Sequence, residues 1–90
     1  MKIQETNEDG ASALALAALS WTLGEPARAD RLLALTGLGP EELRASLAEP
    51  ATLAAILRFL EGHEPDLVAC AETLGVAPTA LVAARRRLEA

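Results

Sequence analysis

The 90-residue sequence is poor in the side chains that most enzymes and metal sites use. It has no tyrosine and one residue each of histidine, cysteine, methionine, tryptophan and phenylalanine. A single cysteine excludes an intrachain disulfide, and one histidine is too few for the histidine and cysteine clusters that hold zinc. Because catalysis needs such groups brought together in a cleft, we expect no enzyme activity and no catalytic, cofactor-binding or metal-binding residues.

Basic residues are also scarce. Eight lysines and arginines face 13 aspartates and glutamates, for a formal net charge of −5. This balance repels phosphate backbones and anionic membranes unless the arginines gather on one face. We therefore do not expect nucleic acid to be a partner.

No stretch of the sequence resembles a membrane span or a secretion signal. The apolar run 11–19 is far shorter than the roughly 20 residues that a spanning helix needs. The segment before it carries Glu5, Glu8 and Asp9 against Lys2 alone, whereas a signal peptide begins with basic residues. We expect a cytoplasmic protein that does not enter a membrane.

The composition is that of one globular domain. Hydrophobic residues make up 51% of the chain and charged residues 23%, and a chain of 90 residues is long enough for a single thin core. Residues 1–10 are polar, acidic and aperiodic. We predict that they form a flexible N-terminal arm and that residues 11–90 form a single helical domain.

Prolines and glycines divide the chain into short helical segments. Proline suits the first position of a helix, and glycine supplies the left-handed residue that follows its end. Five prolines and six glycines recur in this order, with a proline opening and a glycine closing several segments. The predicted segments are residues 11–23, 26–37, 40–48, 50–62, 65–75 and 78–90.

The spacing of apolar residues also indicates helices. Leu53, Ile56, Leu57 and Leu60 fall at i, i+3, i+4 and i+7, and no run shows the alternation of a strand. The sequence predicts an all-α fold, a compact bundle of five or six short helices joined by tight Gly/Pro corners. The leucines expected in its core are Leu33, Leu43, Leu53, Leu57, Leu60, Leu67, Leu74 and Leu81.

Two runs of the sequence carry a family resemblance. Residues 31–44, RLLALTGLGPEELR, followed by LAAILRFL at 53–60, resemble a bacterial family known only as domain of unknown function 3572. The resemblance covers nearly the whole chain after the arm. Its motifs are leucine, glycine and proline positions that form helix corners. It implies a small helical bacterial protein of unassigned activity and supplies no catalytic or binding residue.

Residues 67–88 fit the spacing of a helix-turn-helix. Ala71 is small where the first helix must be, Gly75 lies in the turn, and Leu81 belongs to the apolar set that holds such a corner together. The second helix, however, begins with Pro78 and Thr79 and offers few groups that could bond base edges. A DNA-binding module using residues 67–88 is our alternative interpretation, and a structural corner is the favoured one.

The lone cysteine and the lone histidine each have a simple structural explanation. Cys70 lies on an apolar stripe without a basic neighbour in the sequence, so we expect a buried, unreactive thiol. His63 follows Gly62 and precedes Glu64 and Asp66. One histidine and two carboxylates do not make a metal site, so we expect a solvated loop histidine.

The helix predicted at residues 11–23 is apolar nearly all round. Such a helix is either buried centrally or covered in part by a partner. One of its faces carries Leu14, Ala18 and Trp21, and tryptophan is common at the centre of protein interfaces. We expect the protein to be a noncatalytic interaction or structural module. Its partner would be an unknown protein or a second copy in a homodimer, with Leu14, Ala18 and Trp21 as the possible contact residues.

Overall fold

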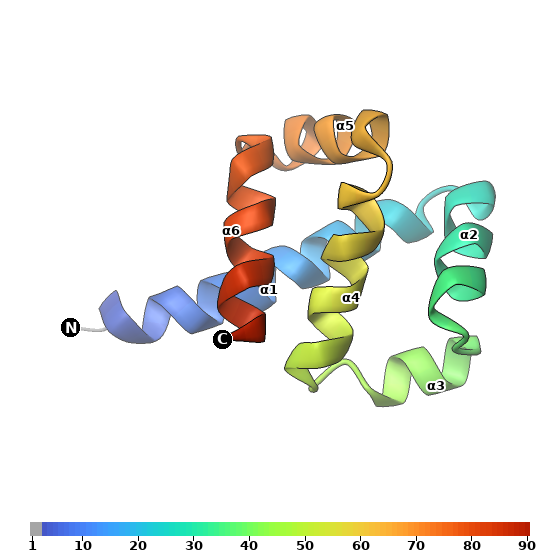
Figure 1. Cartoon of the computed structure of the whole chain (residues 1–90), viewed down its shortest axis with the longest axis horizontal. Coiled ribbons are helices and arrows are strands. Elements are labelled where there is room, and N and C mark those ends of the chain that lie inside the picture. Colours follow the sequence, from blue (N-terminus) through green and yellow to red (C-terminus); the bar gives the residue numbers. More distant parts are fainter. Residues whose placement is uncertain (1–2) are drawn as a thin grey trace.

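The computed structural model describes the backbone of residues 3–90 and the side chains of residues 10–90. It contains six helices and no strand within the described residues, which confirms the predicted all-α fold. Figure 1 shows their arrangement. The helices are α1 (Ile3–Leu23), α2 (Pro26–Thr36), α3 (Pro40–Ala45), α4 (Pro50–Glu61), α5 (Glu64–Leu74) and α6 (Pro78–Glu89).

Helices α1, α4 and α6 form the centre of the molecule. In Figure 1, α4 and α6 lie side by side, and α1 crosses behind both of them. Helix α5 joins the end of α4 to the start of α6. Helix α2 lies on the other side of α4 and runs in the opposite direction. Helix α3 connects the end of α2 to the start of α4.

The core follows most of the predicted leucine positions. Leu43, Leu53, Leu57, Leu60 and Leu81 are buried. The prediction is wrong for three leucines, which are half-buried and pack against the edge of the core: Leu33, Leu67 and Leu74. In α2 the buried residue is the preceding Leu32, and in α5 the buried residues are Cys70 and Ala71, because both helices lie at the periphery of the bundle.

Small side chains allow α1 to approach the centre of the bundle closely. Ala11, Ala15 and Ala18 follow one stripe of the helix and are 0–5% exposed. The buried Thr22 continues this stripe, and its hydroxyl donates a hydrogen bond of 2.8 Å to the Ala18 carbonyl. Because alanine side chains end at Cβ, the axis of α1 can pass close to the neighbouring helices.

Helix α1 begins earlier than the sequence predicts. Its first residue is Ile3, eight positions before the expected start at Ala11, and Gly10 lies inside the helix instead of in the predicted arm. An interior glycine costs only about 1 kcal/mol relative to alanine, which a continuing helix can tolerate. Of the expected arm at 1–10, residues 1–2 and the side chains of residues 1–9 lie outside the described part of the chain.

The helix corners use the predicted glycines and prolines. Gly37 and Gly75 end α2 and α5 in the left-handed region, each with φ of 74°. The Gly37 N–H donates to the Leu33 carbonyl at 2.9 Å, and the Val76 N–H donates to the Ala71 carbonyl at 3.0 Å. Gly62 differs from the expectation, because with φ of −75° it ends α4 in the right-handed region.

Replacing Gly75 with alanine is expected to lower the free energy of unfolding by about 1 kcal/mol. A Cβ at this position would meet no atom within 4 Å, so the cost comes from the left-handed backbone alone. Gly62→Ala is the matched control, since its φ suits any residue and its Cβ would lie 3.5 Å from the nearest atom. We expect the control to be neutral or slightly stabilising. Urea unfolding followed by circular dichroism measures both, and equal losses would contradict the backbone argument.

Candidate functional site

An apolar groove lies between α2 and α4, with α3 at one end. It consists of two adjoining cavities of about 350 and 550 Å³, which share Leu35 and Arg58 in their walls. We call this surface the α2–α4 groove. Its walls are formed by Arg31, Ala34, Leu35, Thr36, Leu38, Leu43, Ala51, Thr52, Ala55, Ile56, Arg58, Phe59, Gly62 and His63.

Helix α3 separates the end of α2 from the start of α4, which contributes to the groove. Helix α3 has six residues, or about 9 Å at 1.5 Å per residue, and α2 and α4 run in opposite directions from its two ends. On the side that faces α2, α4 presents the small side chains of Ala51, Thr52 and Ala55. Small side chains on one wall leave the surface between the two helices hollow, although α2 and α4 also contact each other directly.

Leu35 is the most exposed large hydrophobic residue among the described side chains. It is 68% exposed, compared with 42–45% for Leu16, Leu23 and Val68. Leu35 lies where the two cavities of the groove join, so its side chain borders both. An isolated exposed leucine is ordinary on a protein surface, but a leucine that continues a concave apolar lining is a feature of binding surfaces.

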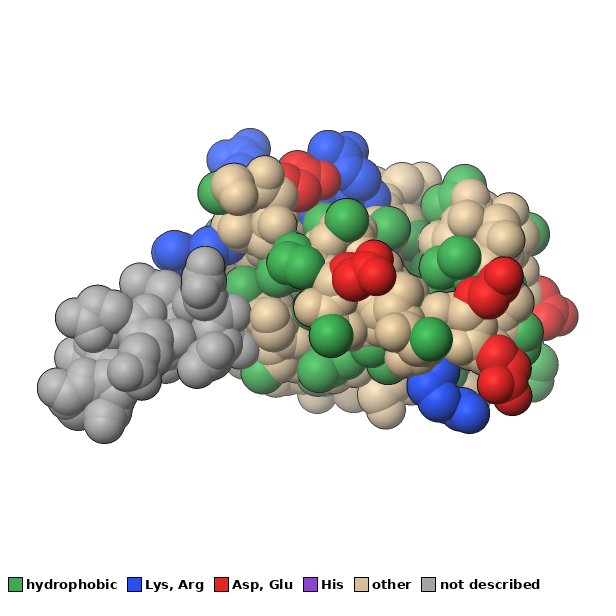
Figure 2. All heavy atoms as spheres, turned by 90° about the horizontal axis from the view of Figure 1, so that it is seen from below, with side chains coloured by type: hydrophobic (Ala, Val, Ile, Leu, Met, Phe, Trp, Pro, Cys, Tyr) green, Lys and Arg blue, Asp and Glu red, His purple; other side chains and the backbone are tan. Residues whose placement is uncertain are grey.

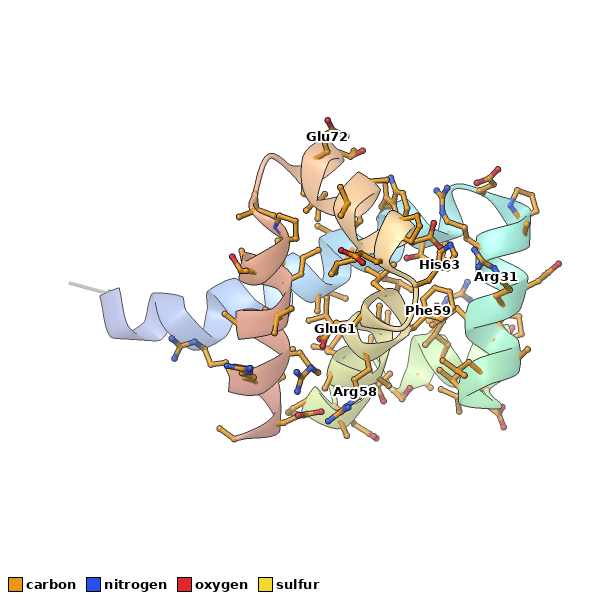
Figure 3. All side chains as sticks on the ribbon, turned by 45° about the horizontal axis from the view of Figure 1, so that its top comes forward. Arg31, Arg58, Phe59, Glu61, His63 and Glu72 are labelled. Carbon is orange, nitrogen blue, oxygen red and sulfur yellow. The ribbon has the colours of Figure 1, made fainter. Side chains whose placement is uncertain are left out.

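The ionisable side chains in the walls of the groove are all basic. They are Arg31 on α2, Arg58 on α4 and His63 after α4. Arg31 and His63 lie close to Phe59 in Figure 3, and the Arg31 guanidinium carbon is 5.8 Å from the centre of that ring. The rim of the groove therefore carries two arginines, and each is paired with a carboxylate that lies outside the lining.

Each rim arginine has one carboxylate partner and keeps a large exposed surface. Arg31 Nη2 lies 3.0 Å from Asp66 Oδ2, and Arg58 Nε lies 2.6 Å from Glu89 Oε2. The side chains of Arg31 and Arg58 remain 48% and 61% exposed. Exposed ion pairs of this kind are weak, so the remaining donors can bond other anions.

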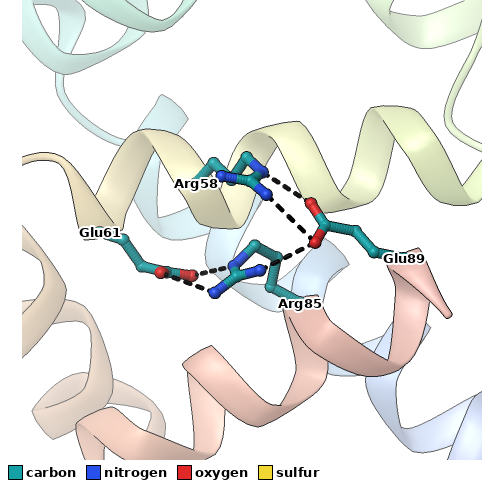
Figure 4. Close-up of polar contacts among 4 residues, drawn as sticks. All are labelled: Arg58, Glu61, Arg85 and Glu89. Atoms are coloured by element: carbon teal, nitrogen blue, oxygen red, sulfur yellow. Dashed lines mark hydrogen bonds and ion pairs between the residues drawn. The ribbon is translucent and has the colours of Figure 1, made fainter.

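Arg58 belongs to an ion-pair network that joins α4 to α6 (Figure 4). Arg85 donates to both oxygens of Glu61, at 2.6 and 3.2 Å, and also donates to Glu89 Oε1 at 2.8 Å. Hydrogen bonds from Arg58 and Arg85 lower the pKa of Glu89, with Arg58 the larger cause. The hydrogen bond from Arg85 to Glu61 is the main reason that the pKa of Arg85 is raised. The network positions the Arg58 guanidinium at the edge of the groove.

The three residues predicted to contact a partner differ in their exposure. Ala18 has no exposed surface, so it cannot contribute to a contact, and that part of the prediction is wrong. Leu14 and Trp21 are half-buried and pack against the core. The reason is the orientation of α1, whose alanine stripe faces inward and whose exposed leucines are Leu16 and Leu23.

Trp21 belongs to the corner between α1 and α2. The Arg28 guanidinium carbon lies 3.7 Å from the centre of the indole ring, a close cation–π contact. Arg28 also donates from Nη2 to the Trp21 carbonyl at 2.7 Å and from Nη1 to Glu25 at 2.6 Å. These bonds bind the end of α1 to the start of α2, which gives Trp21 a structural role.

The lone cysteine and histidine lie in different environments. Cys70 is fully buried, and burial raises the pKa of its thiol; nearby Arg28 lowers that pKa and Asp66 raises it to lesser extents. The His63 side chain is 49% exposed, with Nε2 4.0 Å from Asp66 Oδ2. Within the described residues, no three His, Cys, Asp or Glu side chains are placed to hold a metal ion.

Helices α5 and α6 form the corner expected for residues 67–88, with a bend of 98°. The exposed side chains of α6 include Thr79, Ala83, Arg86 and Arg87. In the described part of the chain, no single helix is long and apolar enough to cross a membrane, although α5 and α6 taken together reach that length and hydropathy.

The arginines do not gather on one face. They lie on α2, α3, α4 and α6, and four of the seven are paired with carboxylates: Arg28, Arg31, Arg58 and Arg85. Figure 2, which shows the face at the α3 end, has basic side chains in separate places with acidic ones among them. The described surface on this side has no continuous basic area.

Of three comparisons of the chain with known proteins, one found a match. A search of the curated proteins and a search of the solved structures found no match. The model of a protein family, described as protein of unknown function (DUF3572), matches residues 8–90, which is nearly the whole chain. The leucine, glycine and proline positions that form its helix corners fall within this match, and the chain belongs to the DUF3572 family.

Proposed function

We propose that this chain is a noncatalytic protein-binding module and that its contact surface is the α2–α4 groove. The observation that carries the proposal is Leu35, a 68% exposed leucine at the junction of two apolar cavities. Covering it with a partner removes apolar surface from water without moving any buried residue. The partner is another protein or a second copy of this chain.

The chemistry of the groove supports binding more than catalysis. Its walls are leucine, alanine, threonine, isoleucine and phenylalanine side chains, and its ionisable groups are two arginines and one histidine. Cys70 is buried in the core and does not line the groove. A nucleophile and a base within hydrogen-bond reach of each other, which covalent catalysis needs, are not among the groups that line it.

DNA binding through residues 67–88 is the alternative with less support. The 98° bend of α5 and α6 suits a helix-turn-helix. However, α6 packs against α1 and α4, and its exposed side chains begin with Thr79 and Ala83. These side chains have few hydrogen-bonding groups that could contact base edges. The arginines lie apart from one another and would give little affinity for phosphates.

Site-specific photo-crosslinking in cells of the native host tests the proposed contact surface. A photoreactive phenylalanine analogue replaces Leu35 in one variant and Val68 in the other. Val68 is 44% exposed on α5 and lies outside the groove, so it serves as the matched control. We expect a discrete crosslinked species from position 35 and none from position 68.

Two outcomes would contradict the proposal. Equal crosslinking at positions 35 and 68 would mean that the contacts are nonspecific. A species formed from Leu16 on α1, with none from Leu35, would move the contact surface to the first helix. Leu16 is 42% exposed and therefore accessible to the same reagent.

A further inference from the structure

Helix α3 is the least anchored helix of the fold. It lies at one end of the molecule, between the end of α2 and the start of α4 (Figure 1). Of the six described helices, it alone forms no extensive backbone packing with another helix. Only one of its six residues, Leu43, is buried, and the flanking Leu38 and Leu47 are half-buried. Six residues are too few for a helix to be stable alone in water, so the position of α3 depends on these side chains.

The hydrogen bonds around α3 are local. We call residues 39–48 the α3 segment. The Leu43 N–H donates to the Gly39 carbonyl at 2.9 Å, and the Ser46 N–H donates to the Glu42 carbonyl at 3.1 Å. Among the described residues, no hydrogen bond or ion pair joins this segment to another helix. The segment can therefore move without breaking a polar contact to the rest of the bundle.

Leu43 borders a cavity on each of its sides. One is the 350 Å³ cavity of the α2–α4 groove. The other, of about 160 Å³, is lined by residues of α1, α2 and the α3 segment: Leu19, Leu23, Leu33, Pro40, Leu43, Arg44 and Leu47. Leu43 is the one residue that lines both cavities. If its side chain left this position, the space that it vacates would adjoin both of them.

From these observations we infer that the α3 segment is a flap that Leu43 holds closed, and that its opening joins the groove to the second cavity. Gly37, in the left-handed region, and Gly39 precede or begin the segment, so the backbone can change direction there. The inference rests on the proposed function and adds a conformational step to it. Leu35 can be covered with the flap closed, whereas opening gives the groove a deeper apolar cleft. A large apolar side chain of the partner in this cleft would favour the open form, because a ligand shifts a protein toward the state that it binds better.

Thiol labelling of the full chain tests the flap. The variants are Leu35→Cys, Leu43→Cys and Leu57→Cys, each combined with Cys70→Ala to remove the native thiol. Leu35 is exposed and Leu57 is fully buried on α4, so they bracket Leu43, which is 4% exposed. Burial of one leucine favours the closed form by roughly tenfold to hundredfold. We expect labelling at position 43 to be at least about tenfold slower than at position 35 and at least about tenfold faster than at position 57.

Hydrogen exchange of the unchanged protein gives an independent measurement, since Leu43→Cys itself shortens the side chain that holds the flap. The amide protons of Leu43 and Ser46 should be protected at least about tenfold less than that of Leu57. Their exchange should also respond less to low concentrations of urea, because a local opening exposes less surface than global unfolding does.

Two outcomes would overturn the inference. If positions 43 and 57 are labelled equally slowly and their amides are equally protected, α3 opens only when the whole fold opens. If position 43 is labelled as fast as position 35, Leu43 does not hold the segment closed. Neither result changes the crosslink that we expect from position 35 in cells. If that crosslink is absent, the proposed function fails, whereas the labelling and exchange rates still decide whether the flap opens.

Discussion

Replacing Leu57 with alanine is expected to lower the free energy of unfolding by about 3 kcal/mol. Leu57 has no exposed surface and lies on α4, which packs against both α1 and α6. The substitution removes buried methyl groups and leaves a cavity that the surrounding helices can fill only in part. A domain of this length has a total stability of roughly 5–13 kcal/mol, so the loss is a large fraction of it.

Leu35→Ala is the matched control for this substitution. It makes the same chemical change on a residue that is 68% exposed, and we expect the free energy of unfolding to change by less than about 0.5 kcal/mol. Urea unfolding measured on both variants gives the comparison. A loss at Leu35 as large as that at Leu57 would mean that the α2–α4 groove is filled in the folded protein. A small loss at both would place Leu57 outside the core.

Replacing Ala15 with leucine is expected to destabilise the fold by about 2–3 kcal/mol. Ala15 lies in the middle of the buried alanine stripe of α1 and has no exposed surface. A leucine there must push α1 away from its neighbours or adopt a strained rotamer. The midpoint of urea unfolding, read by circular dichroism, should fall accordingly.

Ala13→Leu tests whether this effect comes from packing. Ala13 lies on α1 two residues away and is exposed, so its replacement adds the same atoms to the same helix without meeting the core. Because alanine and leucine have similar helix propensities, the stability should change little. If both variants lost the same amount, the alanine stripe would not be the place where α1 is closely packed.

The corners were predictable because their physics is local. A proline at the first positions of a helix and a left-handed glycine after its end act within a few residues, and α2, α3, α4 and α6 all begin at the predicted prolines. The start of α1 was not predictable in this way. No proline or capping motif marks Ile3, and the polar composition of the first residues resembles that of an arm.

The candidate site was only partly visible in the sequence. A helix that is apolar all round does not reveal which face turns inward, so the sequence predicts Ala18 on a contact surface, whereas the structure buries it. The sequence pattern does not predict the groove, because the groove depends on how α2 and α4 are placed in the tertiary structure. The one available signal was the run of Leu32, Leu33 and Leu35, since α2 cannot bury all three on one narrow stripe.

The packing of α6 against α1 also determines when the fold can be completed during synthesis. Helix α1 ends at Leu23, and its principal neighbour α6 begins only at Pro78. A ribosome adding about 5–20 residues per second needs roughly 3 to 13 s to synthesise residues 24–89. Throughout that interval α1 lacks its principal neighbour, although α2, α4 and α5, which also contact it, are made earlier. The packing of α1 in the core is therefore complete only when the last helix of the fold has been made.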